Sequence, residues 1–295
     1  MKPTIKQSHT KNVLLTLAIS AATIGSGMGI TLIHESFDMP TGPLHNQSGG
    51  LGLGTWTGNG GGLVSGGSMV YGALPTAGNK YIGDPDTGSA GFTESWNNFG
   101  TTLSDAGLLN HGGELWFSLV LKPGSGSNDY GFVGLSSAQG NIGANFSSVP
   151  TGANMAGIWL QNGSDFEIAH AINGTPASRN RVQNNLSLND PTFAVGKFTW
   201  GADAASNDLF EIYLPGTDLA LPGSAADSST MVIDQSTFDE LGVWMRNANS
   251  EVDEIRFGGS YDDVIATVSA AVIPEPSSTA LLGLGFLGLL TLRRR

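Results

Sequence analysis

The sequence predicts an all-β domain, an antiparallel jelly-roll sandwich, between two terminal segments of a different kind. Throughout residues 30–270, short apolar runs with period-two alternation are separated by clusters of Gly, Asn, Asp and Ser. No long amphipathic helical pattern and no repeat of fixed period interrupts these runs. About a dozen short strands over a domain of this length suit a two-layer sandwich better than a small barrel.

The first segment, residues 1–29, has the pattern of a secretory signal peptide and is expected to be helical. Three lysines precede an apolar stretch at residues 13–20, and small residues follow as far as Gly29. A basic start, a short apolar centre and a small-residue exit are the three parts of such a peptide. Several small residues between Ala22 and Gly29 suit the cleavage site. An uncleaved N-terminal anchor is the alternative.

Strand patterns then fill residues 30–270. In chain order they are ITLIHESF, SMVYG, ELWFSLVLK, DYGFVGL, MAGIWLQ, FEIAHAI, GKFTW, LFEIYL, LGVWMR and VDEIRFG. The run ELWFSLVLK is apolar on both faces, which predicts a central strand. GKFTW, LFEIYL and LGVWMR alternate between apolar and polar positions. Strand periodicity predicts a core that includes Phe117, Leu119, Phe198, Phe210, Ile212 and Val243.

The charge of the chain excludes several kinds of partner. Six of the 13 basic residues but only one of the 25 acidic residues lie outside 30–270, so this domain carries 7 positive and 24 negative charges, a net charge of −17. Nucleic acid and anionic membrane surfaces are poor partners for such a field. The chain has no cysteine, so no disulfide contributes to its stability.

The last segment, residues 271–295, has three parts in fixed order. A proline turn comes first, an apolar run at about 278–292 follows, and a basic stop ends it. The turn is Pro274, Glu275 and Pro276, and the stop is Arg293, Arg294 and Arg295. As a helix the run spans roughly 22 Å, short of a hydrocarbon core of about 30 Å, but flanking polar residues narrow the mismatch. We therefore predict a transmembrane helix with its arginines in the cytoplasm. A buried core helix is the alternative.

This tail resembles the PEP-CTERM sorting segment of Gram-negative bacteria. The resemblance implies processing by an exosortase-type membrane protease. It also implies transient anchoring in the inner membrane and a final place at the cell surface or in the extracellular matrix.

A second resemblance covers most of residues 30–270. The stretch from His34 to Trp56 contains Phe37-Asp38, a Gly-Leu turn and the pair Gly49-Gly50. It is similar to the start of the concanavalin A-like (laminin G-like) jelly rolls found in bacterial PEP-CTERM proteins. The resemblance implies a fold and a destination, but no single activity, because the fold serves lectins, hydrolases and adhesion modules.

Catalytic patterns are weak in this sequence. Laminarinase-type hydrolases of the same fold carry Glu-x-Asp-x-Glu on one strand, and EVDEIRF invites the comparison. Where the pattern requires its second glutamate, this strand has Ile255. Alternation predicts that the neighbouring Glu254 faces away from Asp253, so one catalytic carboxylate is missing. Alternation also places Asp253 with Ile255 and Phe257, where a buried carboxylate needs an arginine, a backbone donor or a metal.

Two oxygen-rich turns are candidate calcium sites. One contains Asp84 and Asp86, and the other contains Asp203, Asn207 and Asp208. Calcium takes about six to eight oxygen ligands, and closely spaced Asp and Asn side chains supply them. The alternative is that such turns only connect strands.

The candidate ligand-binding residues are Trp244 and Arg246. In LGVWMR they share the polar face with Gly242, opposite the apolar face of the same strand. An exposed indole there would stack on a sugar ring. We therefore expect an exported, exosortase-sorted protein with a non-catalytic binding or structural domain that is related to glycans and extracellular polysaccharide. The alternatives are a glycan-active hydrolase or lyase with an unrecognised site, and a structural domain without a ligand.

Overall fold

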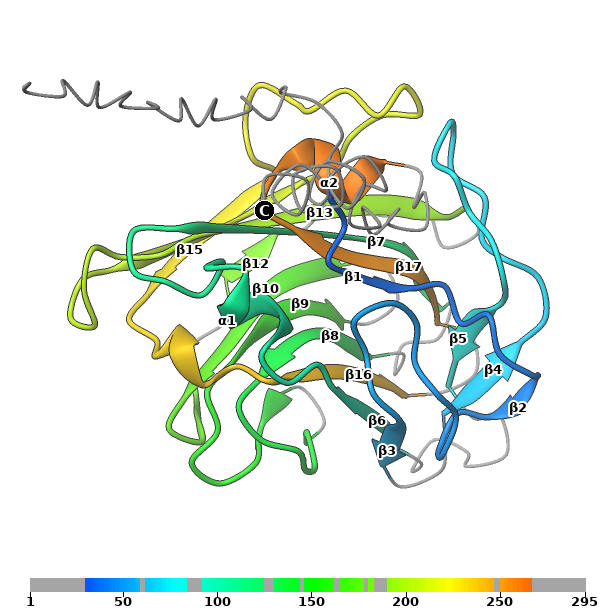
Figure 1. Ribbon diagram of the computed structural model, residues 1–295, viewed down its shortest axis with the longest axis horizontal. Coiled ribbons are helices and arrows are strands. Elements are labelled where there is room, and N and C mark those ends of the chain that lie inside the picture. Colours follow the sequence, from blue (N-terminus) through cyan, green and yellow to red (C-terminus); the bar gives the residue numbers. More distant parts are fainter. Residues whose placement is uncertain are drawn as a thin grey trace, which may run out of the picture.

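The computed structural model describes residues 30–58, 62–83, 92–124, 130–143, 146–161, 165–177, 180–182, 190–246 and 250–266. The predicted signal peptide (1–29) and the predicted sorting tail (271–295) lie outside these ranges. Within them, no helix has the length and apolarity that crossing a bilayer requires. The predicted all-β sandwich is confirmed: the strands of the described chain pair antiparallel in two sheets, and the helices beside them are short (Figure 1).

The first layer is a nine-stranded sheet. Its order is β15 (Asp227–Met231), β14 (Asp208–Tyr213), β13 (Thr192–Thr199), β7 (Glu114–Lys122), β17 (Glu251–Gly258), β5 (Lys80–Ile82), β4 (Leu63–Ser65) and β2 (Gly42–Pro43), with β1 (Ile33–Glu35) paired to β17. As predicted, ELWFSLVLK (β7) is a central strand, between β13 and β17.

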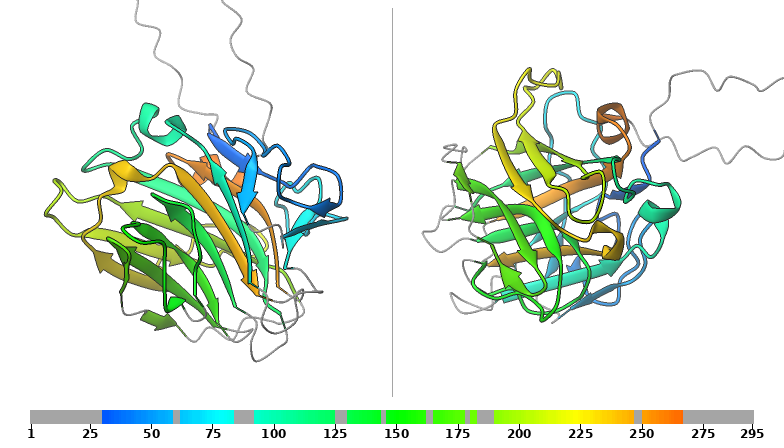
Figure 2. Two further views of the ribbon diagram at one scale, coloured as in Figure 1. Left: turned by 90° about the horizontal axis from the view of Figure 1, so that it is seen from below. Right: turned by 90° about the vertical axis from the view of Figure 1, so that its left-hand side faces the viewer.

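The second layer is an eight-stranded sheet. Its order is β11 (Thr175–Pro176), β10 (Asp165–Ile172), β9 (Met155–Gln161), β8 (Gly131–Ser136), β16 (Glu240–Arg246), β6 (Phe92–Asn98) and β3 (Trp56–Gly58), with β12 (Asn180–Val182) paired to β10. Short helices among the described residues include α1 (Thr102–Asp105), α2 (Tyr261–Ile265) and a 3-10 turn, Gln235–Thr237. Figure 2 shows the two layers from further directions.

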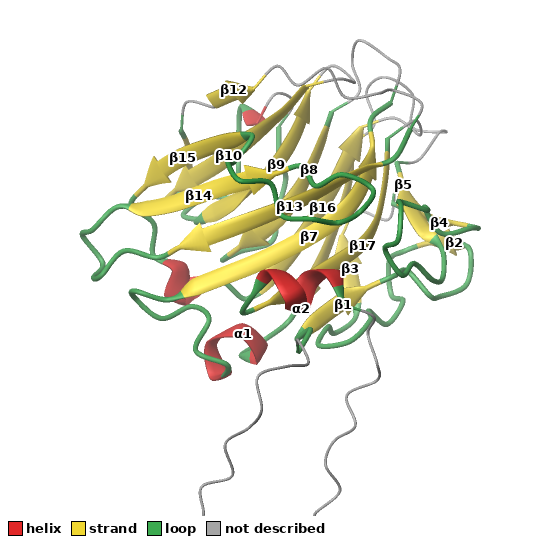
Figure 3. Ribbon diagram, turned by 90° about the horizontal axis from the view of Figure 1, so that it is seen from above, coloured by secondary structure: helices red, strands yellow, loops and turns green. Residues whose placement is uncertain are grey.

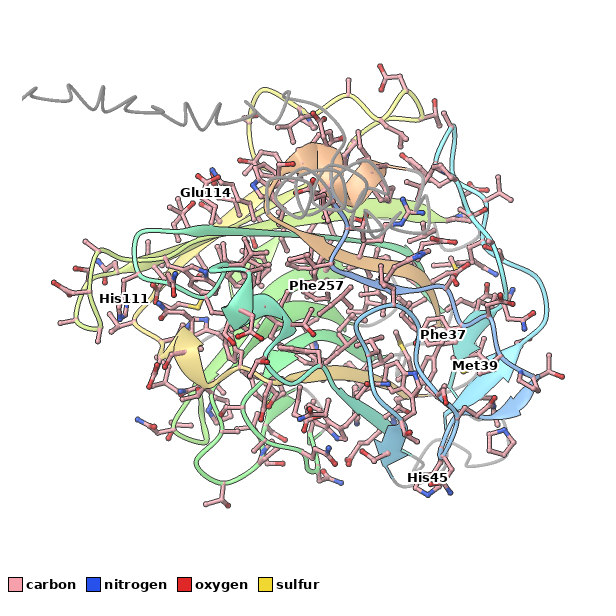
Figure 4. The ribbon with its side chains drawn as sticks, in the orientation of Figure 1. Phe37, Met39, His45, His111, Glu114 and Phe257 are labelled. Carbon is pink, nitrogen blue, oxygen red and sulfur yellow. The ribbon has the colours of Figure 1, made fainter. Side chains whose placement is uncertain are left out.

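The main core lies between the two sheets. All six predicted core residues are buried there: Phe117, Leu119, Phe198, Phe210, Ile212 and Val243. The rings of Phe198 and Phe210 stack at 4.1 Å between centroids. A Cβ on Gly196 would come within 2.0 Å of the Phe117 ring, so this strand position admits only glycine. Phe257 lies between the layers in Figure 4, whereas His45 and His111 lie at the periphery.

The stretch that resembles the jelly-roll start gathers around one buried carboxylate, Glu35. It accepts hydrogen bonds from the backbone of Phe37 (2.6 Å) and Gly50 (3.0 Å) and from the indole Nε1 of Trp56 (3.0 Å). A Cβ on Gly50 would lie 2.0 Å from the carbonyl oxygen of His34, which explains the glycine. Burial raises the pKa of Glu35, while these hydrogen bonds lower it; burial prevails.

A β-bulge in β17 corrects the predicted alternation. Glu254 has φ +52°, and the register with β7 shifts between Asp253 and Arg256. Ile255 and Phe257 face the core, as alternation requires, but the extra residue moves Asp253 to the outer side of the sheet. The expectation that Asp253 shares a face with Ile255 was therefore wrong, and so was the separation of Asp253 from Glu254.

Glu254 and Arg256 form a buried ion pair on that outer side. Oε2 of Glu254 accepts from Nη2 of Arg256 at 2.7 Å and contacts Nε2 of His34 at 2.6 Å. Oε1 accepts from the backbone N–H of Ala77 at 2.7 Å. Burial acts to raise the pKa of Glu254, but the His34 hydrogen bond and the Arg256 charge outweigh it and hold the pKa below its usual value.

Asp253 accepts hydrogen bonds from backbone donors, which is one of the three kinds of partner expected for a buried carboxylate at this position. Its Oδ2 accepts from the hydroxyl of Ser68 at 2.7 Å and from the N–H of Met69 at 2.8 Å, and its Oδ1 accepts from the N–H of Glu254 at 2.8 Å. Burial nevertheless raises the pKa of Asp253 to about 7, and the neighbouring charge of Glu254 adds to the effect.

This shift predicts a pH dependence. The ordinary pKa of an aspartate is 3.8, and the pKa of Asp253 in the folded domain is about 7. The folded chain therefore binds this proton more tightly than the unfolded chain does. Its contribution to stability is therefore fully present below the ordinary pKa and is lost as the pH rises through the folded pKa. We expect the unfolding free energy of wild type, minus that of Asp253→Asn, to fall between about pH 4 and pH 7. Chemical unfolding measured across this range tests it, with the exposed Asp105→Asn as the control; a constant difference for Asp253→Asn contradicts the assignment.

Candidate functional site

The outer face of the eight-stranded sheet carries an unusual set of side chains. Core-facing residues such as Leu241 and Val243 alternate on β16 with outward-facing ones. The outward set on five adjacent strands is Glu94 and Trp96 on β6; Glu240, Gly242, Trp244 and Arg246 on β16; Phe132 and Gly134 on β8; Gly157 and Trp159 on β9; and Glu167 and Ala169 on β10. We call this set the outer face.

One row of side chains on the outer face consists of three aromatic residues with a carboxylate at each end. Strand register places Glu94, Trp244, Phe132, Trp159 and Glu167 side by side on successive strands. The indoles of Trp159 and Trp244 stack at 5.0 Å between centroids, with an interplanar angle of 22°. Two indoles thus lie parallel at the centre of the sheet.

The next row consists largely of glycine. Gly242, Gly134 and Gly157 are neighbours in register. A Cβ on Gly242 would lie 2.6 Å from the Trp96 ring, and one on Gly157 would lie 3.0 Å from the Phe132 ring. The glycines therefore let the rings of Trp96 and Phe132 lie directly on the sheet backbone.

The connection between β8 and β9 folds over this face. We call its described parts, residues 137–143 and 146–154, the cover. Ile142 and Phe146 of the cover belong to the same buried cluster as Trp159 and Trp244, and the Phe146 ring meets Trp159 edge-on at 5.6 Å between centroids. As a result Trp159 is 0% exposed and Trp244 is 1% exposed.

Gln139 and Ile142 of the cover make polar contacts with carboxylates. Nε2 of Gln139 donates to Oε1 of Glu240 at 3.0 Å, and Oε1 of Gln139 accepts from the Thr57 hydroxyl at 2.9 Å. The backbone N–H of Ile142 donates to the carboxylate of Glu94. Both carboxylates that hold the cover therefore belong to the outer face.

Burial raises the pKa of both carboxylates. It raises the pKa of Glu94 against the hydrogen bond from Ile142. It also raises the pKa of Glu240 against hydrogen bonds from Asn98 and Gln139, with the charge of Asp239 acting in the same direction as burial. Within the described part of the chain, Oε2 of Glu240 and Nε1 of Trp96 are buried without a hydrogen-bond partner. These two atoms are an acceptor and a donor that a ligand on this face can use.

The structure corrects the prediction for Trp244. Its indole does project from the polar face of β16, but the cover and Trp159 bury it, so it is not an exposed platform. Arg246, on the same face, is half-buried, and its guanidinium carbon lies 5.6 Å from the centroid of the Tyr130 ring. The two predicted residues are neighbours on one face, but only Arg246 reaches solvent.

The structure describes one of the two predicted calcium loops. Asp84 and Asp86 lie outside the described residues. In the other loop, Asp208 is buried, and its two oxygens accept from the N–H groups of Gly201 (2.8 Å) and Ile233 (2.9 Å). The exposed Asp203 accepts from Ala205 and Ser206 in a local turn, and Asn207 is exposed. Among the described residues, no three His, Asp or Glu side chains gather as a metal site.

Comparison with known proteins identifies the tail. Residues 272–295 match the PEP-CTERM protein-sorting motif. The C-terminus is a PEP-CTERM sorting motif. This motif signals exosortase-dependent export and membrane-associated sorting in Gram-negative bacteria. This confirms the resemblance of the tail to the PEP-CTERM sorting segment. No curated protein sequence matches the chain.

Some solved structures are similar to this chain at low sequence identity. A protein of unknown function from Shewanella oneidensis MR-1 is 12% identical, with a TM-score of 0.44 over 88% of this chain and 100% of that one. An endo-β-1,4-glucuronan lyase from the fungus Trichoderma reesei is 12% identical, with a TM-score of 0.45 over 79% and 98%. A Bacillus licheniformis β-glucanase is 12% identical, with a TM-score of 0.43 over 80% and 100%. At such identities no residue role is transferred.

Proposed function

We propose that this protein is a non-catalytic glycan-binding protein of the cell surface or extracellular matrix, and that its ligand face is the outer face of the eight-stranded sheet. The observation that carries the proposal is the pair of parallel indoles, Trp159 and Trp244, set among carboxylates on the outside of the sandwich. The PEP-CTERM motif supports the destination.

The chemistry of the outer face suits a sugar. A pyranose offers an apolar face of C–H groups and a rim of hydroxyls, each of which can donate and accept. Aromatic rings pack against the apolar C–H face, and a few well-placed polar groups form hydrogen bonds with the hydroxyls. Oε2 of Glu240 and Nε1 of Trp96 are polar atoms of this kind. The net charge of −17 over residues 30–270 favours a neutral polysaccharide over a polyanion.

Binding on this face requires the cover to move. The ligand would displace Ile142 and Phe146 from the indoles and replace the contact of Gln139 with Glu240 by contacts to sugar hydroxyls. The same burial favours a second candidate, a structural domain in which the outer face is simply a second core. The two candidates differ in one property, because only the first binds a polysaccharide.

The spacing of the carboxylates supports a non-catalytic role. Glu94 and Glu167 lie four strand spacings apart in register, about 19 Å at about 4.8 Å per spacing. Glu240 is opposite Asn98, which places it about 13 Å from Glu94 along the strands. Glycosidases hold their two carboxyl groups about 5–9.5 Å apart. The strand EVDEIRF, the other candidate, lies in the opposite sheet.

We expect the exported full chain to bind a neutral polysaccharide weakly, so a glycan screen should reach millimolar ligand, where the binding free energy is about −4 kcal/mol. Glu240→Gln should weaken binding about tenfold, because it removes a charged acceptor while conserving volume. Glu211→Gln, on the outer side of the other sheet, is the matched control.

Three outcomes contradict the proposal. Equal binding by Glu240→Gln and wild type places the ligand elsewhere. Absence of binding to every glycan favours the structural domain. Release of reducing ends by the wild-type chain makes it an enzyme.

A further inference from the structure

The two ends of the described domain meet at one carboxylate, that of Asp263 in α2. The backbone N–H of Ile30 donates to Oδ1 at 2.5 Å, and the Thr31 hydroxyl donates to the main-chain oxygen of Asp263 at 2.5 Å. The other carboxylate oxygen accepts from the N–H of Gly259 at 2.8 Å. Figure 3 shows β1, which follows Ile30, beside α2. The start of the domain is thus fastened to its last helix.

Asp263 lacks the partner that a buried carboxylate usually has. It is 9% exposed, and buried Asp is rarely found without a paired charge. Ion pairs between side chains in the described residues involve Glu114, Glu251 and Glu254 as acids, and Asp263 is in none of them. The nitrogens in contact with it are the backbone nitrogens of Ile30 and Gly259, and in the uncut chain both are neutral amides.

The sequence in front of Ile30 can turn that nitrogen into a cation. Gly27 and Gly29 put small residues three positions and one position before the Gly29–Ile30 bond, as signal cleavage requires. Hydrolysis of this bond adds water, leaving a carboxylate on Gly29 and an α-amine on Ile30. With an ordinary pKa of about 8, the amine is an ammonium at neutral pH. Cleavage at any upstream small residue would leave the amide in place.

We propose that export processing cuts the chain between Gly29 and Ile30, and that the new α-ammonium of Ile30 forms an ion pair with Asp263. Signal cleavage then releases the domain from its signal peptide and also supplies the cation that pairs with the buried carboxylate of Asp263. This inference concerns maturation and holds whether or not the outer face binds a glycan.

Two measurements on the exported full chain test the proposal. Intact mass and N-terminal sequencing should show a chain that begins at Ile30, and a start at any other residue overturns the proposal. The rate of α-amine acylation near pH 7 then reports the pairing, because a paired ammonium gives up its proton less readily and is less reactive.

Acylation of Ile30 should be several-fold faster in Asp263→Asn than in wild type. Asp262→Asn changes the charge by the same amount at an exposed neighbour and should leave the rate unchanged. Wild type unfolded in urea should also react several-fold faster than folded wild type, which tests the pairing without any variant. Equal rates for folded and unfolded wild type, or for Asp263→Asn and Asp262→Asn, overturn the ion pair.

Discussion

Trp244→Ala is expected to destabilise the domain by about 3–5 kcal/mol, the usual loss when a buried aromatic side chain is truncated. The indole is 1% exposed and stacks on Trp159 at 5.0 Å, so alanine leaves a cavity under the cover. Urea unfolding of the exported chain measures the loss as a lower midpoint. Val70→Ala, at a side chain that is 69% exposed, is the control and should change stability by less than about 0.5 kcal/mol.

An unchanged midpoint for Trp244→Ala would contradict the closed outer face. Trp244 would then be an accessible platform, as its place on the polar side of LGVWMR first indicated. A large loss of stability means that sugar binding cannot be tested by removing this side chain. For that reason the binding test uses Glu240→Gln, which conserves volume.

Arg256→Met is expected to cost about 3–5 kcal/mol, because it leaves the carboxylate of Glu254 buried without its cation. Arg256 is 1% exposed and also donates to the carbonyl oxygens of Pro75 and Ala266, so three contacts are lost together. The matched control is Arg246→Met on the other sheet. Its contact with Tyr130 contributes about 0.5–1 kcal/mol.

The double variant Arg256→Met with Glu254→Gln separates the two causes of that loss. If the uncompensated charge dominates, removing it should restore a large part of the stability. Equal losses for Arg256→Met and Arg246→Met would show that the pair contributes nothing beyond packing.

The layers and the main core could be predicted because they depend on local alternation. Period-two patterns in LFEIYL and LGVWMR put Phe210, Ile212 and Val243 inward, and the structure buries all three. The sorting tail was equally predictable, since its turn, apolar run and basic stop are contiguous in sequence. Features that depend only on residues close together in the sequence can therefore be predicted from that sequence.

The bulge and the closed face depend on information that no single strand carries. One residue with positive φ, Glu254, moves Asp253 to the other side of β17, and the sequence of the strand does not signal it. Similarly, alternation places Trp244 on the correct side of its strand. Its burial, however, depends on Ile142 and Phe146, which lie about a hundred positions earlier in a connection without periodicity. Glu94, Glu240 and Trp159 were missed for the same reason, since only the strand order brings them to one face.

Hydrogen exchange on the exported full chain during the glycan titration tests the central claim most directly. If the outer face is the ligand face, saturating polysaccharide should make backbone amides of the cover exchange faster, because the ligand displaces it from the indoles. Amides of β7 and β13, in the opposite sheet, should stay unchanged. Unchanged exchange in the cover at saturation, or a change confined to the nine-stranded sheet, would contradict the account.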